Sequence, residues 1–117
     1  MSNGPISIGS TEQFNSLLKS SNIVIADFET DWCASCKVIA PLYEQLAKSL
    51  SRPNAVTFVK INGDEQPELK GYGVTGFPTF LIFKNGKLED TVKGADPHQL
   101  PAAVNKIIQE AGSVSET

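Results

Sequence analysis

The stretch IVIADFETDWCASCK, residues 23–37, contains both cysteines of the chain and indicates its fold. Residues 23–28 are apolar or β-branched apart from one acid, Asp27, and this pattern predicts a buried strand. From Cys33 onward, apolar residues recur at helical spacing. The two cysteines, Cys33 and Cys36, therefore lie where a strand leads into a helix.

The start of a helix favours the reactive form of a cysteine. Unpaired backbone N–H groups and the positive end of the helix dipole both stabilise a thiolate relative to a thiol. We therefore predict that Cys33 is a nucleophile. Cys36 is close enough in sequence to close a small ring with Cys33 and to resolve a mixed disulfide. A loop this small would stabilise a fold little, so the pair is predicted to serve chemistry.

Length and composition indicate one domain with its own core, since the chain has 117 residues of which 40% are hydrophobic. We assign residues 1–112 to this domain and residues 113–117 to a polar tail. No signal peptide begins the chain and no apolar run reaches the ~18 residues of a membrane span, so we expect a cytoplasmic protein. With 10 Lys and Arg against 13 Asp and Glu, and no basic cluster, we expect no nucleic-acid or membrane partner.

Local signals on both sides of the cysteines define the first half of the chain. Ile6 and Ile8 predict a short strand, and residues 10–13, Ser-Thr-Glu-Gln, have the form of a capping box that begins a helix. The helix that begins at the cysteines continues with a broad apolar stripe from Val38 to Leu50. Residues 52–54, Arg-Pro-Asn, end this helix.

The second half predicts a strand at residues 56–61, which completes a β-α-β unit, and a short helix at residues 67–72. Residues 79–83 and 88–92 predict a hairpin around Asn85-Gly86, a dipeptide suited to a type I′ turn. Asp96 as the N-cap and Pro97 at the first helical position predict a final helix. This order implies an α/β fold, in which a mixed sheet has helices on both faces.

The motifs and their order resemble the thioredoxin family over nearly the whole chain. A lone CxxC would be weak support, because zinc and iron–sulfur sites also contain it. Here an acid in the preceding strand and a Gly-x-Pro-Thr segment accompany it. The matching residues are Asp27-Phe28, Trp32-Cys33, Cys36-Lys37, Ile39-Ala40-Pro41, Lys60-Ile61-Asn62, Gly76-Phe77-Pro78-Thr79, Phe83-Lys84-Asn85-Gly86 and Gly94-Ala95. The resemblance implies the thioredoxin fold, a central mixed sheet of about five strands flanked by about four helices.

The resemblance also implies a protein disulfide reductase that cycles between a Cys33/Cys36 dithiol and a disulfide. Cys33 would attack a substrate disulfide, and Cys36 would then release the reduced product from the mixed disulfide. In the family, thioredoxin reductase supplies electrons from NADPH, so we expect this reductase and disulfide-containing proteins as partners. No nucleotide-binding loop is visible in the sequence, and we expect a monomer with no bound cofactor and no metal.

Asp27 and Lys60 are predicted to tune the cysteines. Burial of Asp27 in an apolar strand should raise the pKa of its carboxyl group and make it a proton acceptor for Cys36. The alternative is a structural carboxylate with satisfied hydrogen bonds. Lys60 matches the family position near this acid and would modulate its charge, or else it is a solvated lysine on a strand.

By resemblance, a group of residues near the cysteines forms a wall for protein substrates, with Pro78 as the family's cis-proline. The alternative is ordinary packing residues with two turn glycines. The predicted substrate-binding residues are Trp32, Gly76, Phe77, Pro78, Gly94 and Ala95. The single histidine, His98, is assigned no role.

Two departures from the family concern tuning. Ala34-Ser35 replaces the usual Gly-Pro, which removes a rigid residue and restores a backbone donor, so we predict a less reducing couple. Glu29 adds a carboxylate two residues after Asp27 and, with Asp31, would place negative potential near the thiols. The alternative is that both acids point to solvent and are screened.

Two other functions compete with that of a reductase. One is a thioredoxin-like docking module of a larger protein, with the polar tail as part of a linker and with thiols that matter little. The other is a metal or iron–sulfur site shared between two chains, because one chain offers only Cys33, Cys36 and an isolated histidine.

Overall fold

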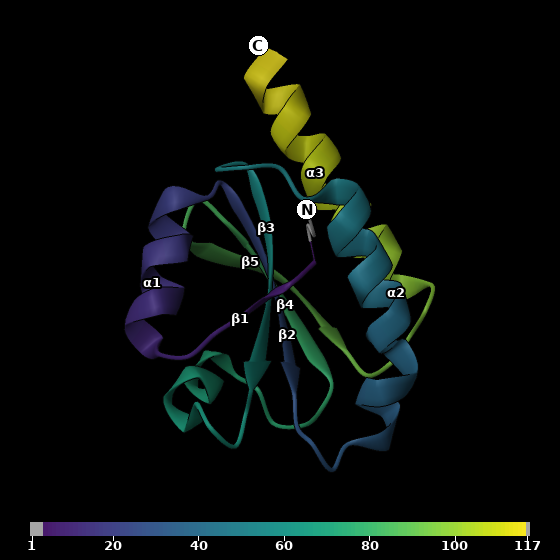
Figure 1. Ribbon diagram of the computed structural model, residues 1–117. Coiled ribbons are helices and arrows are strands. Elements are labelled where there is room, and N and C mark those ends of the chain that lie inside the picture. Colours follow the sequence, from purple (N-terminus) through teal and green to yellow (C-terminus); the bar gives the residue numbers. More distant parts are fainter. Residues whose placement is uncertain (1–3, 117) are drawn as a thin grey trace.

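Strand β2 (Ile23–Glu29) is the middle strand of a five-stranded sheet in the computed structural model, which describes residues 4–116 (Figure 1). The sheet order is β1-β3-β2-β4-β5. Strands β1 and β2 run parallel to β3, whereas β4 runs antiparallel to both β2 and β5. The other strands are β1 (Ile6–Ser7), β3 (Val56–Asn62), β4 (Thr79–Lys84) and β5 (Lys87–Lys93). The predicted mixed sheet is confirmed.

Helices cover both faces of the sheet (Figure 1). The described residues form α1 (Thr11–Ser20), α2 (Ala34–Leu50), the short 3₁₀ helix η1 (Pro67–Tyr72) and α3 (Gln99–Glu116). Residues of α1 and η1 pack in one apolar cluster, and residues of α2 and α3 pack in another on the opposite face. Strand β2 contributes to both clusters, which explains why it is a continuous apolar run. None of the helices in residues 4–116 is long and apolar enough to cross a membrane.

The structure confirms the helix cap at Ser10 and the turn at Asn85-Gly86 that the sequence predicts. The Ser10 hydroxyl accepts a hydrogen bond from the Gln13 N–H at 3.1 Å, while the Gln13 side chain accepts from the Gly9 N–H at 2.6 Å. In a capping box this side chain would accept from the N–H of the N-cap residue, Ser10, whereas here it accepts from Gly9, the residue before the N-cap. Asn85 and Gly86 have φ values of 52° and 82°, as a type I′ turn requires.

Three expectations about helices are corrected. Val38 is 78% exposed and lies outside the buried side of α2, because Ile39 takes the inward position of this turn.

Helix α3 begins at Gln99, two residues after Pro97, since Pro101 has no N–H to donate to the Pro97 carbonyl. Asp96 still caps this helix, as its Oδ1 accepts from the N–H groups of Gln99 and His98, and these two bonds lower the pKa of Asp96. Residues 113–116, which we assigned to a tail, continue α3, while residue 117 lies outside the described residues.

Candidate active site

The two cysteines form a disulfide at the start of α2, just after β2 ends. Figure 1 shows the segment that joins β2 to α2 at the bottom of the view. Cys33 is the N-cap residue, its N–H donates to the Thr30 carbonyl at 3.3 Å, and its sulfur accepts from the Cys36 N–H at 3.1 Å. Their Cα atoms are 5.3 Å apart. The structure therefore confirms the strand-to-helix position, and it directs a helix-start N–H at the sulfur predicted to be the nucleophile.

Ser35 lies in the first turn of α2 and places its hydroxyl 3.5 Å from the Cys33 sulfur. A disulfide sulfur has no hydrogen, so the hydroxyl is the donor in this state. We expected the loss of proline to matter through a restored backbone donor. The contact that the structure shows comes instead from the Ser35 side chain, and Ala34 offers no such group.

Asp27 is buried in β2 with 2% of its surface exposed, and its Oδ1 has no hydrogen-bond partner among the described residues. The pKa of Asp27 is raised to about 8, chiefly by burial and then by the Glu29 charge, while the Lys60 charge lowers it. The interpretation as a structural carboxylate with satisfied bonds is therefore wrong for this oxygen. A carboxyl group whose pKa lies this close to neutrality is suited to proton transfer.

Tyr43 and Lys60 lie near Asp27 on different elements. Lys60 faces Asp27 across the β2–β3 ladder, but its ammonium group forms an ion pair with Glu29, with 3.5 Å between Nζ and Oε2. Glu29 therefore does not simply point to solvent, whereas Asp31 is exposed. Tyr43 of α2 directs its hydroxyl at the carbonyls of Ile25 and Val59 on the two strands. Burial, and then the Asp27 charge, raise the pKa of Tyr43 well above its ordinary value.

Trp32 and Phe77 form an aromatic surface beside the cysteines. The Trp32 side chain is 69% exposed, and its ring meets that of Phe77 edge to face at a centroid distance of 5.8 Å. Asp64 accepts a hydrogen bond from the Trp32 indole N–H at 2.8 Å. Gly63 leaves room for the Phe77 ring, because a Cβ there would lie 2.5 Å from ring carbons.

The Phe77–Pro78 peptide bond is cis, as the resemblance implied. The Pro78 carbonyl accepts from the Gly94 N–H at 2.9 Å, and the Gly76 carbonyl accepts from the Thr79 hydroxyl. Gly94 has a φ of 92°, so a side chain there would strain the backbone. Contacts thus connect Trp32, Phe77, Pro78 and Gly94, whereas Ala95 packs against the apolar cluster of α2 and α3.

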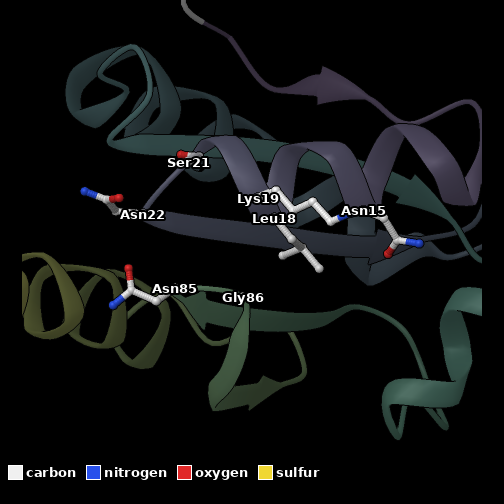
Figure 2. Close-up of a pocket in the computed structure, with 7 residues that line it drawn as sticks. All are labelled: Asn15, Leu18, Lys19, Ser21, Asn22, Asn85 and Gly86. Carbon is white, nitrogen blue, oxygen red and sulfur yellow. The ribbon is translucent and has the colours of Figure 1, made fainter.

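A separate pocket of about 520 Å³ lies between the end of α1 and the turn that joins β4 to β5 (Figure 2). Figure 2 shows Leu18 of α1 beside Gly86 of this turn. Asn22 precedes β2, and its carbonyl accepts from the Asn85 N–H at 2.7 Å. This pocket therefore lies where β2 starts, at the opposite end of that strand from the cysteines, and it contains neither of them. Among the side chains that the structure describes, there is no cluster of three or more His, Cys, Asp or Glu able to hold a metal.

The family model described as Thioredoxin matches residues 6–106 of the chain. The chain belongs to the thioredoxin family. It is similar to thioredoxin of Neurospora crassa, with 45% identity over 113 residues that cover 92% of this chain and 89% of the relative. The solved thioredoxin of Malassezia sympodialis has a TM-score of 0.79 and 36% sequence identity, and the match covers 91% of this chain and 93% of the Malassezia chain. The solved thioredoxin of Trypanosoma brucei brucei has a TM-score of 0.83 and 30% sequence identity, and the match covers 93% of this chain and 95% of the Trypanosoma chain.

Thioredoxin family membership and the Cys33–Cys36 disulfide establish a thiol-disulfide oxidoreductase of the protein-disulfide reductase type. The family has no prosthetic cofactor and generally works with thioredoxin reductase and disulfide substrates. Neither the comparisons nor the described structure favours the alternative of a docking module with idle thiols.

Sequence reasoning missed two residues that shape the thioredoxin site. Asp64 and Gly63 follow β3 and contact Trp32 and Phe77, respectively. Their signal was present, because the ends of neighbouring parallel strands meet at one edge of a sheet, and residues after β3 therefore lie beside residues after β2. His98 is exposed and, apart from its backbone bond to Asp96, takes part in none of these contacts.

We expect Ser35→Ala and Ser35→Pro to make the couple more reducing than in the natural chain. In the dithiol form the Ser35 hydroxyl would donate to the Cys33 thiolate, and a charge-assisted hydrogen bond of this kind stabilises the reduced state. Its loss should shift the equilibrium about threefold to tenfold, or roughly 15–30 mV. Equilibration against a glutathione buffer of known potential measures this midpoint. An unchanged midpoint potential in both variants would show that the Ser35 hydroxyl has no effect on the Cys33/Cys36 couple.

Proposed function

We propose that this protein reduces disulfides of cytoplasmic proteins, with electrons that a partner thioredoxin reductase draws from NADPH. The observation that carries the proposal is the Cys33–Cys36 disulfide at a helix start, directly after the exposed Trp32, whose ring packs against the half-buried Phe77. A buried carboxyl group, Asp27, supports it by providing a site for a proton. The sequence contains no nucleotide-binding loop, so in this proposal the NADPH is bound by the reductase.

In the proposed cycle, the Cys33 thiolate attacks one sulfur of a substrate disulfide. A bond forms between Cys33 and that sulfur, the substrate S–S bond breaks, and the other substrate sulfur leaves as a thiolate. Cys36 then loses its proton to the ionised Asp27 carboxylate and attacks the Cys33 sulfur; the bond between Cys33 and the substrate breaks, and the second substrate sulfur leaves as a thiolate. Two electrons have passed to the substrate, and the Cys33–Cys36 disulfide is the product. The partner reductase returns two electrons to this disulfide.

The helix-start N–H bound to the Cys33 sulfur supports Cys33 as the attacking group, since it stabilises negative charge there. Cys36 is 3% exposed, compared with 6% for Cys33, and a buried thiol needs an internal base. The exposed aromatic surface supports binding of an extended protein segment, for which Pro78 and Gly94 would form the wall. These roles extend the family activity to particular residues.

A coupled assay tests the proposal. Oxidised protein, thioredoxin reductase and NADPH are mixed with insulin, and NADPH consumption is followed. We expect consumption to require all components and the Cys33–Cys36 pair. A Cys36→Ser variant should accumulate a mixed disulfide on Cys33, because the resolving thiol is gone; trapping in cytoplasmic extracts would identify substrates. Failure of the reductase to consume NADPH with this protein, while glutathione drives insulin reduction, would overturn the proposed electron source. Cell fractionation tests the location.

A further inference from the structure

Three charged groups lie together at the end of strands β2 and β3. Asp27 and Glu29 are two residues apart on β2 and therefore face the same side of the sheet. Lys60 on β3 is the direct neighbour of Asp27 across the ladder. Its ammonium group nevertheless contacts Glu29, at 3.5 Å, where the two side chains are 28% and 25% exposed. The buried Oδ1 of Asp27 has no hydrogen-bond partner in the part of the chain that the structure describes.

We propose that Glu29 is a positioning residue for Asp27: it binds the Lys60 ammonium group at the rim and keeps that cation from neutralising Asp27, the proton acceptor for Cys36. The inference deepens the proposed function, since it rests on Asp27 as the proton acceptor for Cys36. It assigns a task to a carboxylate that the reductase cycle itself does not use.

The charges that face Asp27 come from three elements. Glu29 lies on β2, Lys60 on β3 and Tyr43 on α2, while β4 places the uncharged Phe80 opposite Asp27. Burial and then Glu29 raise the pKa of Asp27, and Lys60 lowers it. Tyr43 stays neutral, because its own pKa is raised well above the ordinary value. Among the residues that the structure describes, Glu29 and Lys60 are therefore the charged groups that shift the pKa of Asp27.

The ion pair between Lys60 and Glu29 contributes little to the stability of the fold. Both side chains are partly exposed, and pairs in such positions contribute little because water and salt screen them. Its effect on Asp27 is larger, since the carboxyl group lies in the low-dielectric interior, where a nearby charge is weakly screened. A carboxyl group accepts a proton only when it is ionised, so withholding Lys60 from Asp27 moves the release of the mixed disulfide to higher pH.

The oxidised protein provides the direct test, because neither cysteine titrates in the disulfide. The Asp27 side-chain carboxyl carbon is followed by ¹³C NMR against pH in the natural chain, Glu29→Gln, Lys60→Met and the double variant. We expect Glu29→Gln to lower the Asp27 midpoint by about one pH unit, as Lys60 becomes free to approach. Lys60→Met should raise the midpoint, and in its background Glu29→Gln should shift it less, because only the direct effect of the Glu29 charge then remains. Asp31→Asn, which removes an exposed acid nearby, should leave it unchanged.

An unchanged midpoint in Glu29→Gln would overturn the proposal. An equal shift with and without Lys60 would also overturn it, because Glu29 would then act through its own charge alone. A shift in Asp31→Asn as large as in Glu29→Gln would show general surface electrostatics instead of a positioned pair.

The reaction supplies a second readout that a merely structural role would not move. The rate of release of a preformed mixed disulfide is measured from pH 5 to 10, and we expect the profile of Glu29→Gln to shift to lower pH by the same amount as the NMR midpoint. A moved midpoint with an unmoved profile would overturn the role of Glu29 in the reaction. If Asp27→Asn leaves the profile of the natural chain unchanged, the proposed role of Asp27 fails, and the NMR result still judges Glu29 separately.

Discussion

Replacement of Cys33 by serine is expected to lower the rate of insulin reduction at least about 10³-fold, to the level measured without protein. A serine hydroxyl is a far weaker nucleophile than a thiolate at neutral pH, and it cannot form the mixed disulfide. The substitution is nearly isosteric, so the fold should persist. Insulin precipitation in the presence of dithiothreitol measures the rate.

Cys36→Ser is the matched partner of this variant. It retains the attacking thiol at the N-cap of α2 and should undergo one attack, after which the substrate stays attached to Cys33. Mass spectrometry of the adduct distinguishes the two variants. If Cys33→Ser formed the adduct and Cys36→Ser did not, the assigned order of the two thiols would be reversed, and the hydrogen bond from the Cys36 N–H to the Cys33 sulfur would have no catalytic meaning.

Asp27→Asn is expected to stabilise the oxidised protein by about 4 kcal/mol at pH 7. The pKa of Asp27 is raised from 3.8 to about 8, chiefly by burial, so the folded state binds the proton more tightly than the unfolded state. The stability that this proton contributes is complete below about pH 3.8 and is lost as the pH rises through about 8. Asparagine does not titrate and avoids this loss.

Chemical denaturation at pH 4, 7 and 9 measures the difference. The advantage of Asp27→Asn should be small at pH 4, grow toward pH 8 and then become constant. Asp31→Asn serves as the control, since Asp31 is exposed and should show no such trend. A constant difference between the natural chain and Asp27→Asn at all three pH values would show that the folded and unfolded states bind the Asp27 proton equally. The loss of stability at neutral pH is the mark of a buried acid kept for function.

Much of the fold follows from short-range signals that act within a few residues. The Ser10 cap, the Asn85-Gly86 turn and the apolar run of β2 were each predicted from sequence, and the structure places them as predicted. Two other local predictions, on the start of α3 and on Val38, were wrong, and in both cases a neighbouring residue explains the difference. Pro101 delays the start of α3, and Ile39 takes the inward position beside Val38, so the apolar stripe of α2 is narrower than predicted.

The tuning of the site is a matter of contacts between segments that are distant in sequence. Asp64 reaches Trp32 across 32 residues, and Lys60 reaches Glu29 from the neighbouring strand. The contact between the Ser35 hydroxyl and Cys33 is local, but it depends on a side-chain rotamer that the sequence does not specify. In each case the residue type was visible in the sequence and its partner was not.

By itself, the sequence determined the two thiols at a helix start, the buried acid before them and the order of strands and helices, since spacing, capping and hydrophobic periodicity are properties of the chain near each residue. Only the tertiary structure decided that Lys60 pairs with Glu29 instead of Asp27, and that the serine between the cysteines contacts Cys33 through its hydroxyl. The physical reason is that charge interactions depend on distance and burial in space, and both are set when β3 packs beside β2 and α2 covers their ends.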